Sequence, residues 1–291
     1  MNQIKLQEVV FSYDFDKQET RSPKALDHIN LSISKGDFVA VLGRNGSGKS
    51  TLVKLFNALL LPTKGTVCIR GIETGDESQL WEIRRMTGMI FQDPDSQIIG
   101  ATVAEDIAFG PENLGLPAHI IQSRVQDALE SLAMGDYAEC ATHLLSNARK
   151  LRVSLAGILA MQPECILLDE VDAMLDPADR KELMELLRSL CRERGITVVH
   201  VTHNMEEAER ADRVIVLDDG KIVLDGKPAD MFSYVVAIKE AGLDLPQVTE
   251  LFYQLNIDGF NLPVAISGAD EALEILGNMY ADRKYRDAHL N

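Results

Sequence analysis

The segment Gly43–Ser50, with the sequence GRNGSGKS, limits the possible folds of this chain more than any other feature. It fits the pattern G-x-x-x-x-G-K-S/T, which is informative when a strand precedes it and a helix follows it. Both are expected here, because Phe38–Leu42 is an apolar run, and Leu52 and Leu55 begin a helical repeat. Glycines let the backbone curve around phosphate groups, and the helix N-terminus attracts their charge. The segment therefore predicts a nucleotide site.

Individual residues of this loop have predicted roles. Lys49 can reach the β- and γ-phosphates of a nucleotide, and the hydroxyl of Ser50 can ligate Mg²⁺. A glycine-rich turn that binds nothing is the alternative, and the strand–helix context weighs against it. The expected cofactor-binding residues of the loop are Gly43, Asn45, Gly46, Ser47, Gly48, Lys49, Ser50 and Thr51.

The overall charge narrows the choice of partners. The 291 residues include 29 Lys and Arg against 45 Asp and Glu, which gives a formal net charge of −16. Affinity for nucleic acid and for anionic lipid depends on Lys and Arg, so neither is an expected partner. With 46% hydrophobic and 25% charged residues, the composition is that of an ordinary globular protein rather than a disordered one.

Cysteine usage and apolar runs bear on the compartment. The four cysteines form no CxxC pair and no Cys/His metal spacing, so we expect buried thiols in a reducing compartment. The chain begins without the basic-then-apolar layout of a signal peptide, and its longest apolar runs are too short to span a bilayer. We expect a cytosolic chain, or one attached to a membrane only through a partner.

Hydrophobic periodicity divides the chain into parts. Strands are expected at Ile4–Tyr13, Leu26–Ile33, Asp37–Leu42, Gly65–Arg70, Cys165–Asp169, Thr197–Thr202 and Val214–Leu217. Helices are expected at Ile120–Leu132 and Arg149–Met161, within a helical insertion from about 95 to 162, and at Arg180–Arg194, where Gly195 stops the helix. Strands alternating with helices indicate an α/β core with a parallel sheet. After about Ala237, the patterns Val248–Leu255 and Asp270–Leu276 predict a small, mostly helical appendage.

Polar residues follow two of the apolar strands. Asp169 and Glu170 end the first, at the sheet edge where such folds bind ligands. Asp169 would hold Mg²⁺, directly or through water, and Glu170 would polarise the attacking water; a helix N-cap is the alternative for this pair. His203 follows the second and could hold a γ-phosphate, although lone histidines are usually structural. No function is assigned to His119, His143 or His200.

These residues, in this order and approximate spacing, resemble the ATP-binding subunits of ABC transporters. The matching motifs are Gly43–Thr51, the Asp169-Glu170 pair and Thr202-His203. The resemblance implies ATP and Mg²⁺ as cofactors. It also implies a P-loop NTPase (ABC ATPase) core with an antiparallel β subdomain, a helical subdomain and a small C-terminal, mostly helical extension.

The same resemblance assigns three further residues. Gln92 matches the family's Q-loop, which contacts Mg²⁺ and signals to the membrane subunits, so it is expected among the metal and catalytic residues with Glu170 and His203. Tyr13 stands where the family stacks an aromatic ring on adenine, with core packing as the alternative. Asp176 ends a segment similar to the D-loop and is expected near the nucleotide.

Narrower phrases resemble one subfamily, the energy-coupling factor (ECF) transporters, which import vitamins and metal ions in prokaryotes. These phrases are Leu80–Arg85, Phe91–Gln97, Ile107–Leu114 and the tail Ala241–Pro246. The resemblance implies a second ATPase subunit, a transmembrane coupling subunit and a substrate-binding membrane subunit, with this chain peripheral on the cytoplasmic face of the cell membrane. It divides the chain into an ATP-binding domain (1–236, helical subdomain about 95–162) and an extension (237–291) that serves dimerisation.

One motif departs from the family. The segment Leu145–Arg149, with the sequence LSNAR, stands where the family has Leu-Ser-Gly-Gly-Gln, which contacts the γ-phosphate bound to the opposite subunit of a head-to-tail dimer. Side chains replace both glycines, and alanine tolerates positive φ poorly. In a second departure, Val171-Asp172 replaces the usual Pro or Ala followed by Thr.

We therefore expect a heterodimer with one good and one impaired ATP site. The good site would combine Lys49, Glu170 and His203 of this chain with the signature of an intact partner. The alternative is a regulatory nucleotide-binding subunit with weak or no hydrolysis, which the altered signature favours and the intact Glu170 and His203 oppose. Soluble relatives that act on DNA or ribosomes carry two cassettes or long coiled coils, which do not fit into 291 residues.

Overall fold

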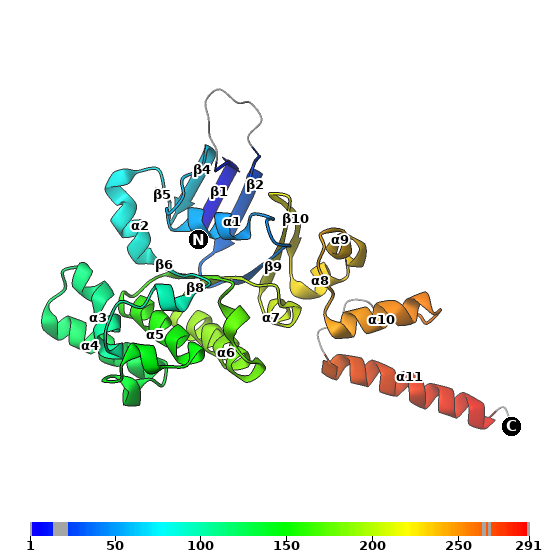
Figure 1. The fold of residues 1–291 in the computed structure, drawn as a ribbon. Coiled ribbons are helices and arrows are strands. Elements are labelled where there is room, and N and C mark those ends of the chain that lie inside the picture. The colour runs from blue at the N-terminus through cyan, green and yellow to red at the C-terminus, as the bar shows by residue number, and fades with distance from the viewer. Residues whose placement is uncertain (1, 14–22, 264–265, 267–268, 290–291) are drawn as a thin grey trace.

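A computed structural model describes residues 2–13, 23–263, 266 and 269–289 (Figure 1). Its first sheet contains β1 (Asn2–Phe11), β2 (Leu26–Ser34), β4 (Lys64–Ile69) and β5 (Ile72–Glu73), in the order β2-β1-β4-β5. Every pairing in this sheet is antiparallel. The antiparallel β part implied by the family resemblance is therefore confirmed.

The second sheet carries the phosphate loop. It contains β3 (Phe38–Leu42), β6 (Thr87–Ile90), β7 (Cys165–Asp169), β8 (Thr197–Val201), β9 (Arg213–Asp218) and β10 (Lys221–Gly226), in the order β10-β9-β3-β8-β7-β6. All pairings are parallel except that of β10 with β9. Val201 of β8 aligns with Val41 of β3 and with Asp169 of β7, so the carboxyl ends of these three strands meet at one edge.

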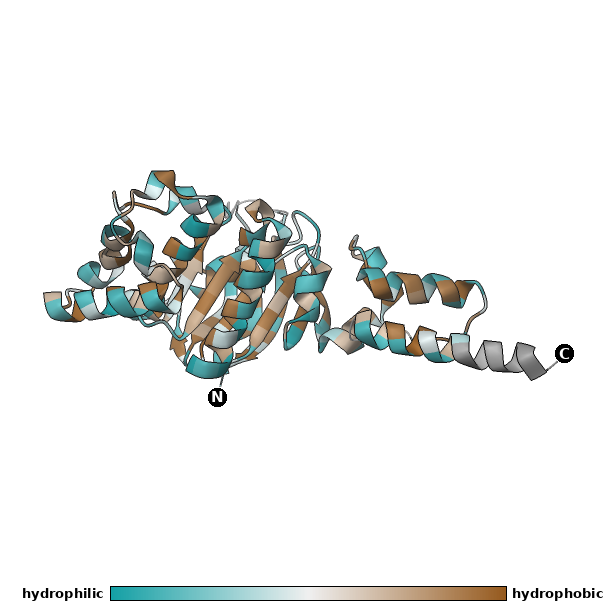
Figure 2. Cartoon of the chain, turned by 90° about the horizontal axis from the view of Figure 1, so that it is seen from below, coloured by the Kyte–Doolittle hydropathy of each residue, from teal (hydrophilic) through white to brown (hydrophobic). Residues whose placement is uncertain are grey.

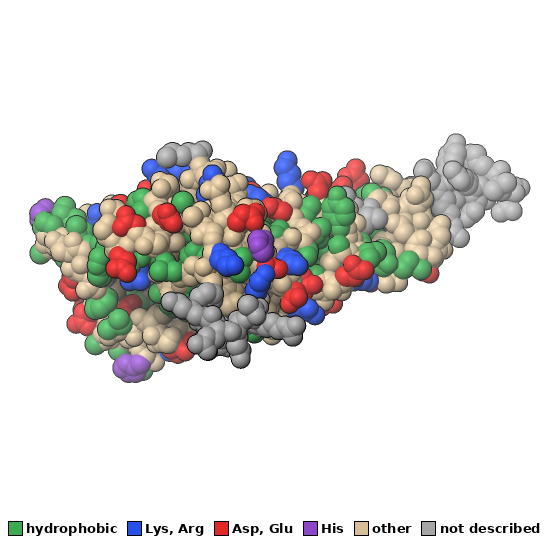
Figure 3. All heavy atoms as spheres, turned by 90° about the horizontal axis from the view of Figure 1, so that it is seen from above, with side chains coloured by type: hydrophobic (Ala, Val, Ile, Leu, Met, Phe, Trp, Pro, Cys, Tyr) green, Lys and Arg blue, Asp and Glu red, His purple; other side chains and the backbone are tan. Residues whose placement is uncertain are grey.

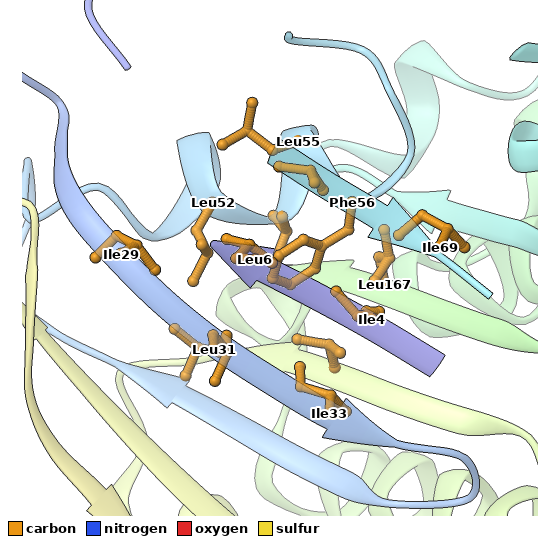
Figure 4. Close-up of a cluster of buried hydrophobic side chains, with 14 of the residues drawn as sticks. Ile4, Leu6, Ile29, Leu31, Ile33, Leu52, Leu55, Phe56, Ile69 and Leu167 are labelled. Atoms are coloured by element: carbon orange, nitrogen blue, oxygen red, sulfur yellow. The ribbon is translucent and has the colours of Figure 1, made fainter. Parts of the chain in front are cut away.

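Helix α1 (Lys49–Phe56) follows β3 and lies between the two sheets (Figure 4). Leu52, Leu55 and Phe56 are fully buried and belong to one apolar cluster with Ile4 of β1 and Leu167 of β7. Burying each of these side chains stabilises the fold by roughly 1.5–3 kcal/mol. This packing fixes α1, and with it the loop that precedes the helix.

Helix α6 (Pro177–Arg194) has a start and a stop that the chain sets chemically. The Asp176 carboxylate accepts hydrogen bonds from the backbone N–H groups of Ala178 and Asp179, and Pro177 occupies the first position. Gly195 ends the helix at a φ of +64°. The predicted stop is confirmed, whereas the helix begins three residues before the predicted start at Arg180, because Asp176 and Pro177 set the start ahead of the apolar repeat.

Residues 95–162 contain helices and no strand, as predicted. The helices are α3 (Val103–Asn113), α4 (Ala118–Ser131) and α5 (Asn147–Ala160). Thr102 and Glu105 form a capping box at the start of α3, a signal in the sequence that was overlooked. Figure 1 shows these three helices grouped on one side of the six-stranded sheet.

The remaining elements are short helices and the C-terminal part. They are α2 (Leu80–Met86), α7 (Met205–Glu209), α8 (Pro228–Phe232), α9 (Val235–Glu240), α10 (Gln247–Ile257) and α11 (Ala269–His289), with 3-10 turns at Glu77–Gln79, Pro94–Ser96, Gly135–Tyr137, Thr142–Leu144 and Val171–Met174. Helices α10 and α11 lie side by side and project from the rest (Figures 1 and 2). The predicted helix Asp270–Leu276 was too short, because the charged residues that follow interrupt its apolar repeat.

Four strands of the six-stranded sheet, β3, β6, β7 and β8, are buried along their whole length, whereas the edge strand β10 has no buried residue. A cluster on this sheet joins Ala40 and Leu42 of β3 to Ile238 of α9 and to Leu243 and Leu245 beyond it. The first residues after position 236 thus share a core with the strand that leads into the phosphate loop.

Acidic and basic side chains are interspersed on the face shown in Figure 3. Cys165 and Cys191 are buried as expected, but Cys68 and Cys140 are partly exposed. Among the described residues, no helix is both long and apolar enough to cross a membrane.

Candidate phosphate-binding and catalytic site

Glycine is required at two positions of the phosphate loop for different reasons. Gly48 has a φ of +104°, and a Cβ there would lie 2.5 Å from the carbonyl oxygen of Ala25. Gly46 has a φ of +83°, with no atom within 4 Å of an added Cβ. The first position is limited by space and backbone angle together, the second by backbone angle alone. The loop can therefore adopt this curve only with these glycines.

Lys49 is buried, and its ammonium is held in place by the loop itself. Its Nζ donates to the carbonyl oxygens of Gly43 at 2.8 Å and Arg44 at 3.1 Å, and lies 3.4 Å from Oε1 of Glu170. Burial lowers the pKa of Lys49, while the nearby carboxylates of Glu170 and Asp169 oppose the shift. A cation fixed in this way can bind the phosphates of a nucleotide without first being ordered.

Ser50 and Asp169 bring two oxygen ligands together. The Ser50 hydroxyl donates to Oδ1 of Asp169 at 2.8 Å, across the gap between α1 and the end of β7. Burial raises the pKa of Asp169, and the Ser50 hydrogen bond opposes that rise. Hydroxyl and carboxylate oxygens are ligands that Mg²⁺ prefers, so these residues fit the ion that the resemblance implied.

Glu170 has an unusual backbone and a defined partner. Its φ of +53° is rare for a residue with a side chain, and its backbone N–H donates to the carbonyl oxygen of Val201 at 3.0 Å. Its Oε1 lies 2.8 Å from Nε2 of His203. Two of the three side chains predicted to be catalytic therefore meet, although they are separated by 33 residues in the sequence.

A cleft of about 410 Å³ lies over the loop. Besides Ala25, its lining consists of predicted residues: Tyr13, Asn45, Gly46, Gly48, Lys49, Ser50, Thr51, Gln92 and Glu170. Tyr13 is 62% exposed, and its hydroxyl is within hydrogen-bond distance, 2.9 Å, of Oγ1 of Thr51. Its ring meets Phe11 edge to face at 4.9 Å. A flat aromatic side chain thus stands at the edge of the phosphate site, where it remains available to a base.

Other predicted residues are placed differently. Asp176 caps α6 with its carboxylate and is not part of the cleft lining. Ser47 is buried beneath the loop, and Gln92 is exposed on the cleft wall. Gln97, to which no role was assigned, accepts from the backbone of Phe91 and donates to the carbonyl of Met89. It thereby fixes the chain where β6 passes into the Gln92 segment.

The segment Leu145–Arg149 has its own local structure. Ser146 caps α5, and its hydroxyl accepts from the backbone N–H of Arg149 at 3.5 Å. The Arg149 guanidinium lies 4.4 Å above the ring of Tyr137. Ala148 is partly buried against the apolar cluster of the helical part. The segment is therefore an ordinary helix start with one cation directed at an aromatic ring.

Comparisons with known proteins agree with this geometry. The family described as ABC transporter matches residues 26–173. The chain is 51% identical to the energy-coupling factor transporter ATP-binding protein EcfA1 of Caldanaerobacter subterraneus subsp. tengcongensis, over 94% of this chain and 98% of that protein. It is 50% identical to EcfA1 of Clostridium novyi over the same shares of the two chains.

Solved structures have the same fold. The structure of cbiO1 from Clostridium perfringens, described as part of the ABC transporter complex cbiONQ, superposes with a TM-score of 0.75 at 34% identity, covering 87% of this chain and 99% of that chain. A dimeric post-hydrolysis state of the ATP-binding cassette MJ0796, bound to ADP and Pi, superposes at 0.68 with 32% identity, covering 77% and 98%.

A strand–loop–helix that presents Lys49, an Asp169–Ser50 pair and a Glu170–His203 pair is thus found in a chain whose relatives match almost end to end. The chain belongs to the ABC transporter ATPases and, within them, to the ATP-binding subunits of energy-coupling factor transporters.

Proposed function

We propose that this subunit couples ATP hydrolysis to the uptake of a vitamin or metal ion through membrane partners. The observation that carries the proposal is the contact of Glu170 with His203 at 2.8 Å, next to the Lys49 ammonium at 3.4 Å. A carboxylate, an imidazole and a fixed cation at the mouth of a phosphate loop supply what in-line attack of water on a γ-phosphate needs. The names of the relatives support the transport role.

Each residue of the site has a proposed task. The loop from Gly43 to Thr51 binds the phosphates through its backbone N–H groups and Lys49, and Tyr13 stacks on adenine. Glu170 orients and polarises the attacking water, while His203 contacts the γ-phosphate and holds the Glu170 carboxylate in place.

Ser50, Asp169 and Gln92 would hold Mg²⁺. When bound, the ion neutralises charge on the phosphate oxygens. Ser50 and Asp169 already lie in contact, so they need little rearrangement to share a ligand, and Gln92 lines the same cleft. Asp176 would act at a distance from the phosphates by fixing the start of α6, from where the D-loop faces a second subunit.

We further propose that the chain pairs with a second, different ATPase subunit. The segment Leu145–Arg149 lacks both glycines of the family signature, and Ala148 and Arg149 are already engaged in local contacts. In a head-to-tail dimer this segment would face the phosphate loop of the partner. An intact partner signature would complete the site of this chain and leave the opposite site impaired. The extension from 237 to 291 would contribute to dimerisation.

The remaining partners follow from the subfamily. A transmembrane coupling subunit and a substrate-binding membrane subunit would hold this chain on the cytoplasmic face of the cell membrane. The relative described as part of the complex cbiONQ supports such an assembly. The solute itself would be bound by the membrane subunit, not by this chain.

The test is ATP turnover by the complex that co-purifies with the tagged full-length chain. Glu170→Gln should reduce turnover at least about 100-fold while nucleotide binding is retained, because the carboxylate acts on water and not on ATP. A regulatory subunit with weak or no hydrolysis, which the altered signature favours, would instead show little turnover before the substitution. A purified homodimer with two sites that both hydrolyse at full rate would contradict the heterodimer.

A further inference from the structure

Three buried titratable side chains lie directly behind the catalytic residues. Asp172 is in the turn after Glu170, His200 is in β8, and Glu207 is in α7. Their exposed fractions are 7%, 0% and 4%. No role was assigned to any of them from the sequence, although a histidine within the apolar run of β8 is itself an unusual feature. Their burial requires a partner for every charge.

Thr202 joins two of these groups. Its Oγ1 lies 3.0 Å from Oδ2 of Asp172 and 2.8 Å from Oε2 of Glu207, and it accepts from the backbone N–H of Asn204 at 2.9 Å. A hydroxyl has a single proton to donate, so both carboxylates cannot accept from it at once. One of the two must carry a proton and donate to Thr202.

The surroundings of the two carboxyl groups decide which one that is. Burial raises the pKa of Glu207 to about 7, and the Asp172 charge adds to the rise, against the effects of His200, Thr202 and Arg180. Burial also acts to raise the pKa of Asp172, but contact with His200 and the hydrogen bond from Thr202 bring it below its ordinary value. Protonated Glu207 therefore donates to Thr202, which donates to ionised Asp172.

His200 lies between the same two groups. Its Nε2 is 3.5 Å from Oδ1 of Asp172, and its Nδ1 is 3.7 Å from Oε2 of Glu207. Arg180 supplies a cation, with Nε 3.7 Å from Oε1 of Glu207. The two ring nitrogens therefore face different carboxyl groups, and the imidazole lies between Asp172 and Glu207. A single metal ion could not be bound by both ring nitrogens at once, so this arrangement does not favour a shared metal site.

The cluster connects the two chain segments that carry Glu170 and His203. Asp172 lies two residues after Glu170. Thr202 directly precedes His203, and Glu207 lies four residues after it. The backbone N–H of Glu170 also donates to Val201 at 3.0 Å, so the two loops are tied at both the backbone and the side-chain level. A loss of the Thr202 contacts would free the His203 segment to move relative to Glu170.

We propose that Asp172, His200, Thr202 and Glu207 are positioning residues that hold Glu170 and His203 at their working distance. This inference rests on the proposed roles of Glu170 and His203 in hydrolysis. Asp172 occupies one of the two positions, Val171-Asp172, at which the sequence departs from the family that it resembles, and the buried His200 ring lies 3.5 Å from its carboxylate.

The decisive comparison is between Thr202→Val, which removes the hydroxyl at nearly constant volume, and Thr202→Ser, which keeps it. In the purified complex, Thr202→Val should lower kcat at least about 10-fold and change the KM for ATP less than twofold. Thr202→Ser should keep kcat within about threefold of the unchanged protein. The opposite order, or a fall in Tm with unchanged kcat, would show that only packing matters and would overturn the proposal.

A second variant covers a failure of Thr202→Val to fold. Asp172→Asn preserves shape and an acceptor for Thr202 but removes the charge facing His200, so kcat should fall about 3- to 10-fold at constant KM. If kcat stays within twofold, the proposal is wrong. One equivalent of divalent metal retained by the full-length chain after chelator treatment, and lost in Asp172→Asn, would overturn it in favour of a metal site.

Glu170→Gln, measured in parallel, separates this proposal from the proposed function. If Glu170→Gln abolishes turnover and Thr202→Val does not lower it, only the positioning role fails. If Glu170→Gln retains turnover, the assignment of the catalytic carboxylate itself is wrong.

Discussion

The phosphate loop leads into α1, and the segment Leu145–Arg149 leads into α5. The two segments differ in how closely a ligand can approach their backbone. The loop has three glycines at positive φ, and the side chains of Asn45, Lys49, Ser50 and Thr51 line one cleft. The other segment has no glycine, a capping serine, and an arginine that rests on Tyr137. The comparison teaches that a helix N-terminus becomes a phosphate site only when the backbone ahead of it is free to approach the ligand.

The largest expected effect tests the phosphate loop. Gly48→Ala should destabilise the fold by about 3 kcal/mol or more and abolish ATP binding, since the new Cβ would lie 2.5 Å from the carbonyl oxygen of Ala25 at a φ of +104°. Denaturant unfolding and nucleotide titration measure both losses. Gly46→Ala is the matched control, because it has strain in φ and no clash, so a loss of only about 1–2 kcal/mol is expected. Equal losses would contradict the role given to close approach at Gly48.

A second prediction concerns Glu207 in the buried cluster behind Glu170 and His203. Glu207 has a pKa of about 7 in the folded protein against an ordinary value of 4.5, so folding favours its proton. The stability that Glu207 contributes is fully present below pH 4.5 and is lost as pH rises through about 7. The free energy of unfolding of Glu207→Gln should therefore rise, relative to that of the unchanged protein, by up to about 3 kcal/mol as the pH increases from 4.5 to 8. Unfolding curves at several pH values measure this, and parallel curves for the two proteins would refute it.

A third prediction would remove the difference between the two segments. The combined substitution Asn147→Gly, Ala148→Gly and Arg149→Gln should raise ATP turnover of the complex several-fold, because in the proposed heterodimer the opposite site would then face the family signature. That gain should persist when Glu170→Gln inactivates the other site, since the two sites use different carboxylates. Turnover that stays unchanged would show that residues 145–149 do not limit hydrolysis.

The smallest effect concerns Arg149 alone. Arg149→Ala should lower the free energy of unfolding by roughly 0.5–1 kcal/mol through loss of its contact with Tyr137 at 4.4 Å. Arg149→Lys, which keeps a cation, should lose less. Thermal unfolding of the three proteins decides the order, and an equal loss in both variants would point to guanidinium geometry instead.

The sequence predicted well those parts of the fold whose signals are local. Phe38–Leu42, the phosphate loop and α1 form one continuous pattern, and Asp169 and His203 each end an apolar run, so their common sheet edge could be expected. The contact of Glu170 with His203 follows from strand order, which the apolar runs alone do not fix.

The elements and contacts that the sequence did not predict were missed for physical reasons. The strand β10 alternates weakly and pairs only at the sheet edge, and most of α11 lacks a continuous apolar stripe, so neither has a strong periodic signal. The Asp172–His200–Glu207 cluster joins residues from three elements, and nothing local in the sequence announces that they meet. The one local signal for this cluster is His200, a polar residue inside the apolar strand β8.

The base of the C-terminal extension has one more consequence, which is mechanical. Leu243 and Leu245 are buried in the same cluster as Leu42, the last residue of β3 and the neighbour of the phosphate loop. Gly242, just before Leu243, has a φ of +70° and lies close to the Arg44 side chain of the phosphate loop. A displacement of the chain at Leu243 and Leu245 would therefore disturb the apolar packing directly behind the strand that leads into the phosphate loop.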